Sequence, residues 1–177
     1  MQPLADLKVL DLTWHVAGPY CTKLLADYGA DVIKVERPGL GDPARAYGPF
    51  PNDDPHLERS GMFLHLNANK RSVTVDLKSE DGRLIVKELA RWADIVVESF
   101  SPGKLTSLDL DYNDLKAVNP QIIMCSVTSF GQVGPYANWK ATEFTISSMA
   151  GLNLITGVPE MHPLKSADHL QEYQGGS

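Results

Sequence analysis

The sequence predicts an α/β fold, with an open, mostly parallel, Rossmann-like sheet and flanking helices. Two observations support this prediction. Short apolar runs, typical of strands buried on both faces of a sheet, alternate with longer segments of helical periodicity. Glycine, proline and capping residues separate these segments where strands and helices normally end. We therefore expect successive strand–helix–strand units with right-handed connections.

Residues 7–36 form the unit in which these signals are most complete. Residues 7–12 are a short, largely apolar run, as expected of a buried strand. Pro19 suits the first turn of the helix that follows, and Gly29 suits the left-handed position after its last turn. Residues 31–36 are expected to be the second strand. The residues expected on the buried face of the helix are Tyr20, Leu24, Leu25 and Tyr28.

The loops after these two strands are the expected ligand sites, because open parallel sheets bind ligands at the carboxyl ends of their strands. Residues 13–18 carry Trp14 and His15 before a glycine that allows close backbone approach. Residues 37–41 begin with Arg37, whose guanidinium suits phosphate oxygens. The sequence has neither a GxGxxG pattern nor a GxxxxGK[ST] phosphate loop. An ordinary nicotinamide or nucleoside-triphosphate site is therefore not indicated.

Residues 38–69 are irregular, since five prolines interrupt any period. A connection of this length is normally either functional or disordered. We expect it to lie over the ligand side of the sheet, with Arg45 and residues 62–66 near the mouth of the site.

Beyond residue 70 the chain again alternates between strand and helix patterns. Strands are expected at residues 72–77, 95–97 and 121–127. Helices are expected from an N-cap at Ser79 to residue 94, near residues 102–104, at residues 111–118, and after Glu143. Residues 163–177 show no terminating element. The residues predicted to face the core are Leu84, Ile85, Leu89 and Trp92 in the first of these helices and Ile146, Met149 and Ala150 in the last.

Composition and charge favour a globular protein over a disordered, nucleic-acid-binding or membrane protein. Hydrophobic residues make up 43% and charged residues 21% of the chain, which is a globular balance. The net charge of −6 argues against nucleic acid or an anionic membrane as partner, while it allows a local basic pocket. The N-terminus lacks signal-peptide order, and no apolar run approaches the roughly 18 residues of a membrane helix. Cys21 and Cys125 predict neither a disulfide framework nor a zinc cluster, so a cytoplasmic location is the default.

Several ordered motifs resemble one enzyme family. They are LKVLDLT, AGPY, LLADYGADVIKVERPGLGDPAR, LNANKRSVTVDLK, ADIVVESFSPGKL and SFGQVGPYA. The series resembles the family III CoA transferases, which include formyl-CoA transferase, carnitine CoA transferase and α-methylacyl-CoA racemase. The resemblance implies that residues 1–177 are the N-terminal, CoA-binding α/β part of that family's large domain, incomplete without a returning C-terminal segment. It also implies an intertwined homodimer for the complete protein.

The resemblance implies a reaction as well. In transferases of this family a carboxylate attacks the acyl-CoA thioester, giving a mixed anhydride and then an enzyme–CoA thioester. The family's motif is an aspartate followed four residues later by glycine. Here Glu172 stands four residues before Gly176, and Asp168 is the nearby aspartate, so both are candidate nucleophiles, with solvated loop carboxylates as the alternative. Glu143, preceded by Lys140, stands where similar transferases have a glutamate close to the reaction centre.

The implied substrates are an acyl-CoA and a carboxylic acid, and no metal is expected because metal-ligand spacing does not stand out. Trp14, Phe63 and Trp92 are expected to serve packing. The residues expected to contact CoA are His15, Val16, Arg37, Leu77, Lys78, Ser99, Phe100 and Lys140.

Two alternatives stay open. A racemase of the same family is less favoured, because proton exchange at Cα needs a His–Asp type pair and Thr142 stands at the racemase-like His position. The other alternative is a catalytically inactive CoA-binding fragment or subunit, whose missing half comes from another chain.

Overall fold

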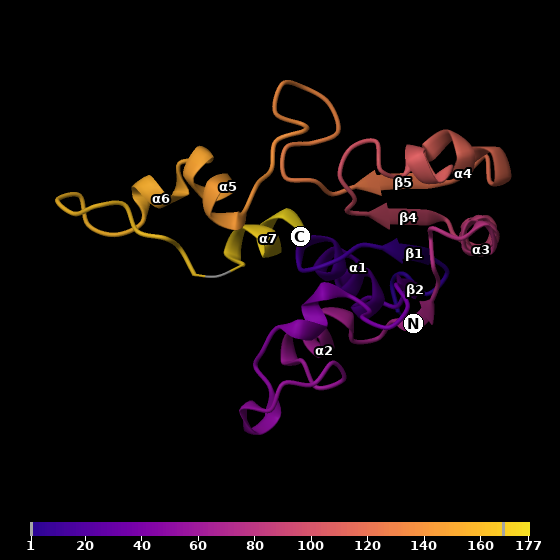
Figure 1. The fold of residues 1–177 in the computed structure, drawn as a ribbon, viewed down its shortest axis with the longest axis horizontal. Coiled ribbons are helices and arrows are strands. Elements are labelled where there is room, and N and C mark those ends of the chain that lie inside the picture. Colours follow the sequence, from indigo (N-terminus) through magenta and orange to yellow (C-terminus); the bar gives the residue numbers. More distant parts are fainter. Residues whose placement is uncertain (1, 168) are drawn as a thin grey trace.

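Five parallel strands form one sheet in the computed structural model, which describes residues 2–167 and 169–177 (Figure 1). The strands are β1 (Lys8–Leu12), β2 (Asp31–Glu36), β3 (Arg71–Thr74), β4 (Ile95–Glu98) and β5 (Ile123–Ser126). Their order is β3-β2-β1-β4-β5, and Leu10 of β1 lies beside Ile33 of β2 and Val96 of β4. The predicted open, parallel α/β sheet is confirmed. The chain changes direction across the sheet at β1 and β4, which is where such sheets bind ligands.

Side-chain caps mark the starts of several helices. Ser60, Ser79 and Thr142 each accept a hydrogen bond from a backbone N–H in the first turn of α2, α3 and α5. Ser79 is thus the predicted N-cap. The helices are α1 (Ala17–Asp27), α2 (Gly61–Asn67), α3 (Glu80–Trp92), α4 (Tyr112–Val118), α5 (Glu143–Met149), α6 (Leu152–Ile155) and α7 (Leu170–Gly175). Short 3-10 turns are η1 (Pro43–Ala46), η2 (Pro51–Asp53) and η3 (Thr106–Leu108).

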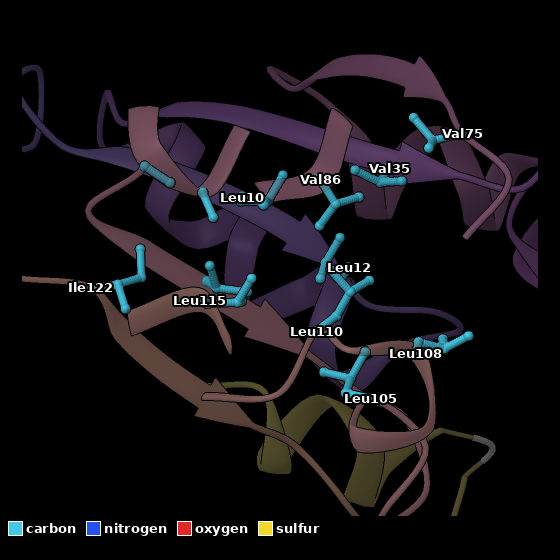
Figure 2. Packing of buried hydrophobic residues seen from close by; sticks show 13 residues of the cluster. Leu10, Leu12, Val35, Val75, Val86, Leu105, Leu108, Leu110, Leu115 and Ile122 are labelled. Atoms are coloured by element: carbon cyan, nitrogen blue, oxygen red, sulfur yellow. The ribbon is translucent and has the colours of Figure 1, made fainter. Parts of the chain in front are cut away.

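Two apolar layers cover the two faces of the sheet. Leu10 of β1 belongs to the larger layer, with Val86 of α3 and Leu115 of α4 (Figure 2). Val9, on the opposite face of β1, packs with Ala26 of α1 in the second layer. Both faces of β1 are therefore buried against apolar side chains, which explains why its sequence is an apolar run rather than an alternating pattern.

The predicted helix faces are partly wrong. In α3, Leu84 and Ile85 are 56% and 46% exposed, whereas Val86 and Ala90 are fully buried. Gly82, Val86 and Ala90 lie four residues apart and therefore share one face of α3, and this face is buried.

The same correction applies to α1 and α5. In α1, Thr22 and Ala26 are buried, and Tyr28, predicted to be buried, is exposed. In α5, Met149 is exposed although it was expected in the core, and Ser147 is buried in its place.

The irregular segment after β2 is built around one buried ion pair. Arg45 donates from Nε to Glu36 Oε2 at 2.7 Å and from Nη2 to Glu36 Oε1 at 2.9 Å. Its guanidinium also lies 3.6 Å from the ring centroid of Phe63 in α2. Arg45 therefore holds this segment on the end of β2, and its charge is engaged by protein groups rather than presented to a ligand.

The C-terminal part differs from the expected open end. Residues 163–177 include a helix, α7, which lies beside α1, while α5 and α6 stand apart from the sheet (Figure 1). Phe144, Leu154 and Ile155 of these two helices are exposed. Among the described residues, no helix has both the length and the apolar character needed to cross a membrane.

Candidate active site

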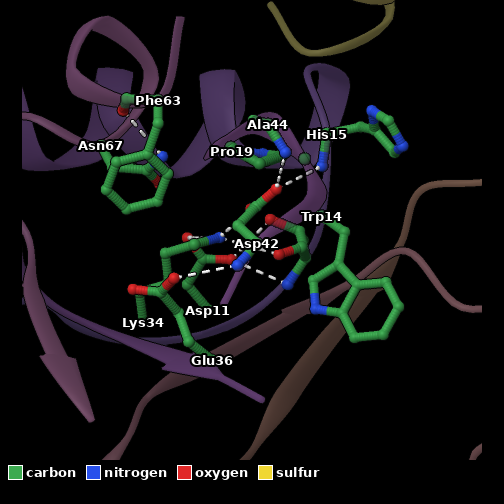
Figure 3. A network of polar contacts seen from close by, with 12 residues as sticks. Asp11, Trp14, His15, Pro19, Lys34, Glu36, Asp42, Ala44, Phe63 and Asn67 are labelled. Atoms are coloured by element: carbon green, nitrogen blue, oxygen red, sulfur yellow. Dashed lines mark hydrogen bonds and ion pairs between the residues drawn. The ribbon is translucent and has the colours of Figure 1, made fainter. Parts of the chain in front are cut away.

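A buried cluster of charges lies beneath the loop that follows β1 (Figure 3). Asp11, at the end of β1, accepts hydrogen bonds from Thr13 N at 2.9 Å and from Lys70 Nζ at 3.0 Å. Lys34 of β2 pairs with Asp42 Oδ2 at 2.8 Å and donates to Thr13 O at 2.8 Å. These contacts tie the loop to two strands and to the segment after β2.

The cluster shifts the acidity of its members. Burial would raise the pKa of Asp11, but two lysines, Lys34 first, and two hydroxyl donors outweigh it and lower that pKa to about 2. Burial lowers the pKa of Lys70 to about 8, against the attraction of Asp11. Asp11 therefore stays ionised although it is buried, because the lysines and hydroxyl donors replace the stabilisation that water would give.

Asp42 and Glu36 extend this hydrogen-bond network to the carboxyl ends of the strands. Asp42 Oδ1 accepts His15 N at 3.2 Å, which fixes His15 in a left-handed conformation with φ of 66°. Glu36 Oε2 accepts Asp42 N at 3.0 Å. Burial would raise the pKa of Glu36, but Arg45 and the other donors lower it to about 2.

The acidities of Asp11 and Glu36 predict loss of stability in acid. Their folded pKa values of about 2 lie below the ordinary 3.8 and 4.5. Between about pH 4.5 and pH 2 the unfolded chain therefore binds more protons, and the free energy of unfolding falls as the pH falls. Urea unfolding at pH 7 and pH 3 measures this. We expect Asp11→Asn to reduce the difference between the two pH values, and an equal free energy at both pH values in the wild type contradicts the account.

A cavity of about 340 Å³ opens at the carboxyl ends of the central strands. Arg37, Lys78 and Lys104 bring three positive charges to its lining, and Trp14 and Phe100 supply aromatic rings. The acids in its lining are Glu36, which Arg45 already neutralises, and Asp76. An excess of cations beside flat rings suits an anionic nucleotide.

The two rings of this cavity come from the loops after β1 and β4. Trp14 and Phe100 pack edge to face with centroids 5.5 Å apart, and the guanidinium of Arg37 lies 5.1 Å from the Trp14 ring centroid. Ser99 Oγ accepts Trp14 N at 2.9 Å. The expected packing role of Trp14 therefore accounts for only part of its contacts, because the ring also lines the cavity.

A larger cavity, of about 570 Å³, lies along β4 and β5. The charged residues in its lining are Glu98 and Asp111, and none of the residues expected to bind CoA line it. Carboxylates repel phosphate, so this cavity is the poorer candidate despite its size.

A second cluster of candidate residues forms where α5 meets α7. Glu143 Oε2 accepts His169 N at 2.6 Å, and His169 Nδ1 lies 2.5 Å from Glu172 Oε2. Imidazole and carboxylate atoms of these three residues all lie within 4.8 Å of one another, an arrangement that zinc also accepts as ligands. Asp168, the other candidate nucleophile, lies outside the described residues.

The end of α7 packs closely against the start of α1 at Gly176. A Cβ added to Gly176 would lie 2.2 Å from Ala17 O, so only glycine fits there. Tyr173 packs on Tyr20 of α1 with ring centroids 4.9 Å apart. No side chain in the described part of the chain caps α1. Pro19 has no N–H and Tyr20 N donates to Val16 O at 2.8 Å, so the first-turn amides left for a ligand are those of Ala17 and Gly18.

Three rings connect the loop after β1 to α7. Tyr47 packs on His15 with centroids 5.7 Å apart and on His169 with centroids 6.3 Å apart. Trp14 and His15 are consecutive, so this loop joins the cationic cavity on one side to the Glu172 cluster on the other. Sequence analysis identified His15 but neither Tyr47 nor His169.

The family model for CoA-transferase family III matches residues 4–177. The chain belongs to this family. It is 42% identical over 166 residues to succinate–glutarate CoA-transferase of Agrobacterium fabrum, covering 93% of this chain and 42% of that protein. It is 45% identical over 166 residues to succinyl-CoA:glutarate CoA-transferase of Mus musculus, covering 93% of this chain and 37% of that protein.

A solved structure shares the fold of this family III chain. The crystal structure of a CAIB/BAIF family protein from Brucella suis matches it with a TM-score of 0.88 at 41% identity, over 97% of this chain and 45% of that one. The chain thus spans about two fifths of the length of the curated relatives it matches. The predicted family and its N-terminal extent are confirmed.

Of the eight residues expected to bind CoA in this family III chain, four line the cationic cavity and four do not. His15 and Ser99 lie in the loops after β1 and β4, where His15 packs on Tyr47 and Ser99 Oγ accepts Trp14 N. Val16 is buried, so it can offer its backbone alone. Lys140 is exposed on the loop before α5 and lines neither cavity. The four are Arg37, Leu77, Lys78 and Phe100.

Proposed function

We propose that the protein carrying this chain transfers CoA between two carboxylic acids, with Glu172 as the attacking carboxylate. The observation that carries the proposal is the placement of Glu172. Its carboxylate is held by His169 on a helix packed against the uncapped first turn of α1. Amides at a helix N-terminus stabilise the oxyanion that forms when a carboxylate attacks a thioester.

The reaction proceeds in two exchanges. Glu172 attacks the thioester carbonyl carbon, the C–S bond breaks, and a mixed anhydride and CoA thiolate result. The thiolate then attacks the Glu172 carboxyl carbon, the bond from that carbon to the bridging oxygen breaks, and the first acid leaves as a carboxylate that carries this oxygen. The second acid reverses both steps. One carboxylate enters and one leaves, so no net proton or electron is consumed.

The cationic cavity is proposed to hold the nucleotide end of CoA. Arg37, Lys78 and Lys104 face phosphate groups, and Trp14 and Phe100 face the base. The loop after β1 joins this cavity to the Glu172 cluster, so an extended CoA molecule reaches from one to the other along His15. On this path His15 contacts the part of CoA between its nucleotide and its thioester.

Arg37→Ala is expected to weaken CoA binding by about tenfold to a hundredfold, because a charged hydrogen bond to phosphate is lost. The fold should keep its stability, since Arg37 is partly exposed and its Nε donates to a loop carbonyl, Gly41 O, at 2.9 Å. Calorimetry of CoA binding on the full-length protein measures the change. Arg91→Ala, on the exposed side of α3, is the matched control, and equal affinity of the Arg37 variant and the wild type refutes the assignment.

Dicarboxylic acids are the proposed substrates, because two relatives are named for succinate and glutarate. The assay is transfer from succinyl-CoA to glutarate by the full-length protein, read as the mass of the CoA thioester formed. Intact CoA binding without product supports the alternative of an inactive CoA-binding module. Thr142 does not support the racemase alternative. Its hydroxyl caps α5 by accepting Thr145 N at 3.4 Å, and threonine is not a general acid or base of the kind that the racemase reaction needs.

A cytoplasmic homodimer is the proposed state of the complete protein. Its support is the family resemblance together with the exposed apolar side chains on α5 and α6, such as Phe144, Leu154 and Ile155. Apolar surface of this kind is normally covered by another part of a protein or by a partner.

A further inference from the structure

We propose that His169 is a positioning residue that fixes the Glu172 carboxylate for attack. This inference rests on the proposed function, because it takes Glu172 as the nucleophile. It assigns a role to a side chain that the sequence patterns did not identify, and it explains what orients a carboxylate on a short helix near the end of the described chain.

The backbone of His169 is held in place by Glu143. His169 directly precedes α7 with φ of 63° and ψ of 9°, a left-handed conformation that costs energy in a residue with a Cβ. Glu143 Oε2 accepts its N–H at 2.6 Å, and Glu143 Oε1 accepts Gln171 N at 3.4 Å. One carboxylate from α5 thus fixes the first turn of α7 and aims the imidazole.

The imidazole in turn fixes Glu172. His169 is the residue before α7 and Glu172 lies in the first turn of that helix, so their side chains meet at its N-terminal end. The distance from His169 Nδ1 to Glu172 Oε2 is 2.5 Å. Because an ionised carboxylate only accepts hydrogen bonds, Nδ1 carries the hydrogen. Oε2 is therefore occupied, and Oε1 is the oxygen left to attack the thioester.

The same hydrogen bond serves the second exchange. When the CoA thiolate attacks the Glu172 carboxyl carbon, the new S–C bond pushes electrons onto Oε2. Charge on Oε2 strengthens the bond from Nδ1–H. Collapse of this oxyanion breaks the bond between the carboxyl carbon and Oε1, and the first acid leaves as a carboxylate that carries Oε1. His169 keeps its proton throughout, so it positions and stabilises but does not act as an acid or base.

Two substitutions at His169 separate this role from a purely structural one. Glycine and asparagine both accept left-handed backbone, whereas only asparagine restores an N–H near the position of Nδ1. The measurement is the rate at which succinyl-CoA and hydroxylamine together modify Glu172 in the full-length protein, followed by peptide mass. His56→Ala, at an exposed histidine in the segment after β2, is the control.

We expect His169→Gly to slow modification of Glu172 by on the order of tenfold to a hundredfold, as for a misplaced reacting group. His169→Asn should recover most of that rate, and the affinity for CoA should stay unchanged in both. Equal rates in the glycine variant and the wild type overturn the role of His169 alone. Equally slow glycine and asparagine variants overturn it as well, whereas no modification of Glu172 in the wild type overturns the proposed function together with this inference.

Discussion

Glu172→Gln is expected to lower the rate of CoA transfer by at least about a thousandfold, because a neutral amide cannot attack a thioester. CoA should still bind, since the cationic cavity lies on the other side of the loop after β1. The measurement pairs the transfer rate from succinyl-CoA to glutarate with calorimetry of CoA. An active Gln variant would remove Glu172 from the mechanism.

Glu172→Asp is the sharper comparison, because it restores the residue of the family's motif. The shorter side chain withdraws the attacking oxygen by more than about 1 Å, which can cost about a hundredfold. His169 also loses its partner at that distance. We expect activity between that of the wild type and that of the Gln variant. Glu160→Gln, at an exposed position in the segment before α7, is the control that should leave transfer unchanged.

Lys34→Ala is expected to destabilise the fold by about 3–5 kcal/mol, because it leaves the buried Asp42 carboxylate without its cationic partner. The side chain of Lys34 is 1% exposed, and its Nζ lies 2.8 Å from Asp42 Oδ2 and 3.9 Å from Asp11 Oδ2. Loss of this amine also frees Thr13 O, so the loop that carries Trp14 and His15 loosens. The free energy of urea unfolding measures the effect.

Lys116→Ala is the matched control for Lys34, because Lys116 is an exposed lysine on α4. We expect it to change the free energy of unfolding by less than about 1 kcal/mol. Similar values for the two lysines would show that the buried cluster contributes far less than its geometry suggests.

The strands were predictable from sequence because strands buried on both faces leave apolar runs, as residues 7–12 do. The helix faces were not, because large apolar side chains were assumed to point inward. In α3 the buried face carries Gly82, Val86 and Ala90, whereas Leu84 is exposed. Which face of such a helix is buried depends on how the helix packs on the sheet, and a single sequence does not give that packing.

Part of the candidate site follows from the position of residues at strand ends. Arg37 and Phe100 come directly after buried strands, and the topology brings them to one cavity. Lys104, Tyr47 and His169 were missed because their neighbours come from distant segments. A signal was available for His169, since it precedes Glu172 by three residues at the start of a helix.

Trapping of the covalent intermediate tests the central claim most directly. The full-length protein is incubated with succinyl-CoA, treated with hydroxylamine or borohydride, and digested for peptide mass analysis, because both reagents act on an activated carboxyl group. The account predicts a modification at Glu172. Modification at Asp168 instead, or no modification while CoA binding is intact, would contradict it.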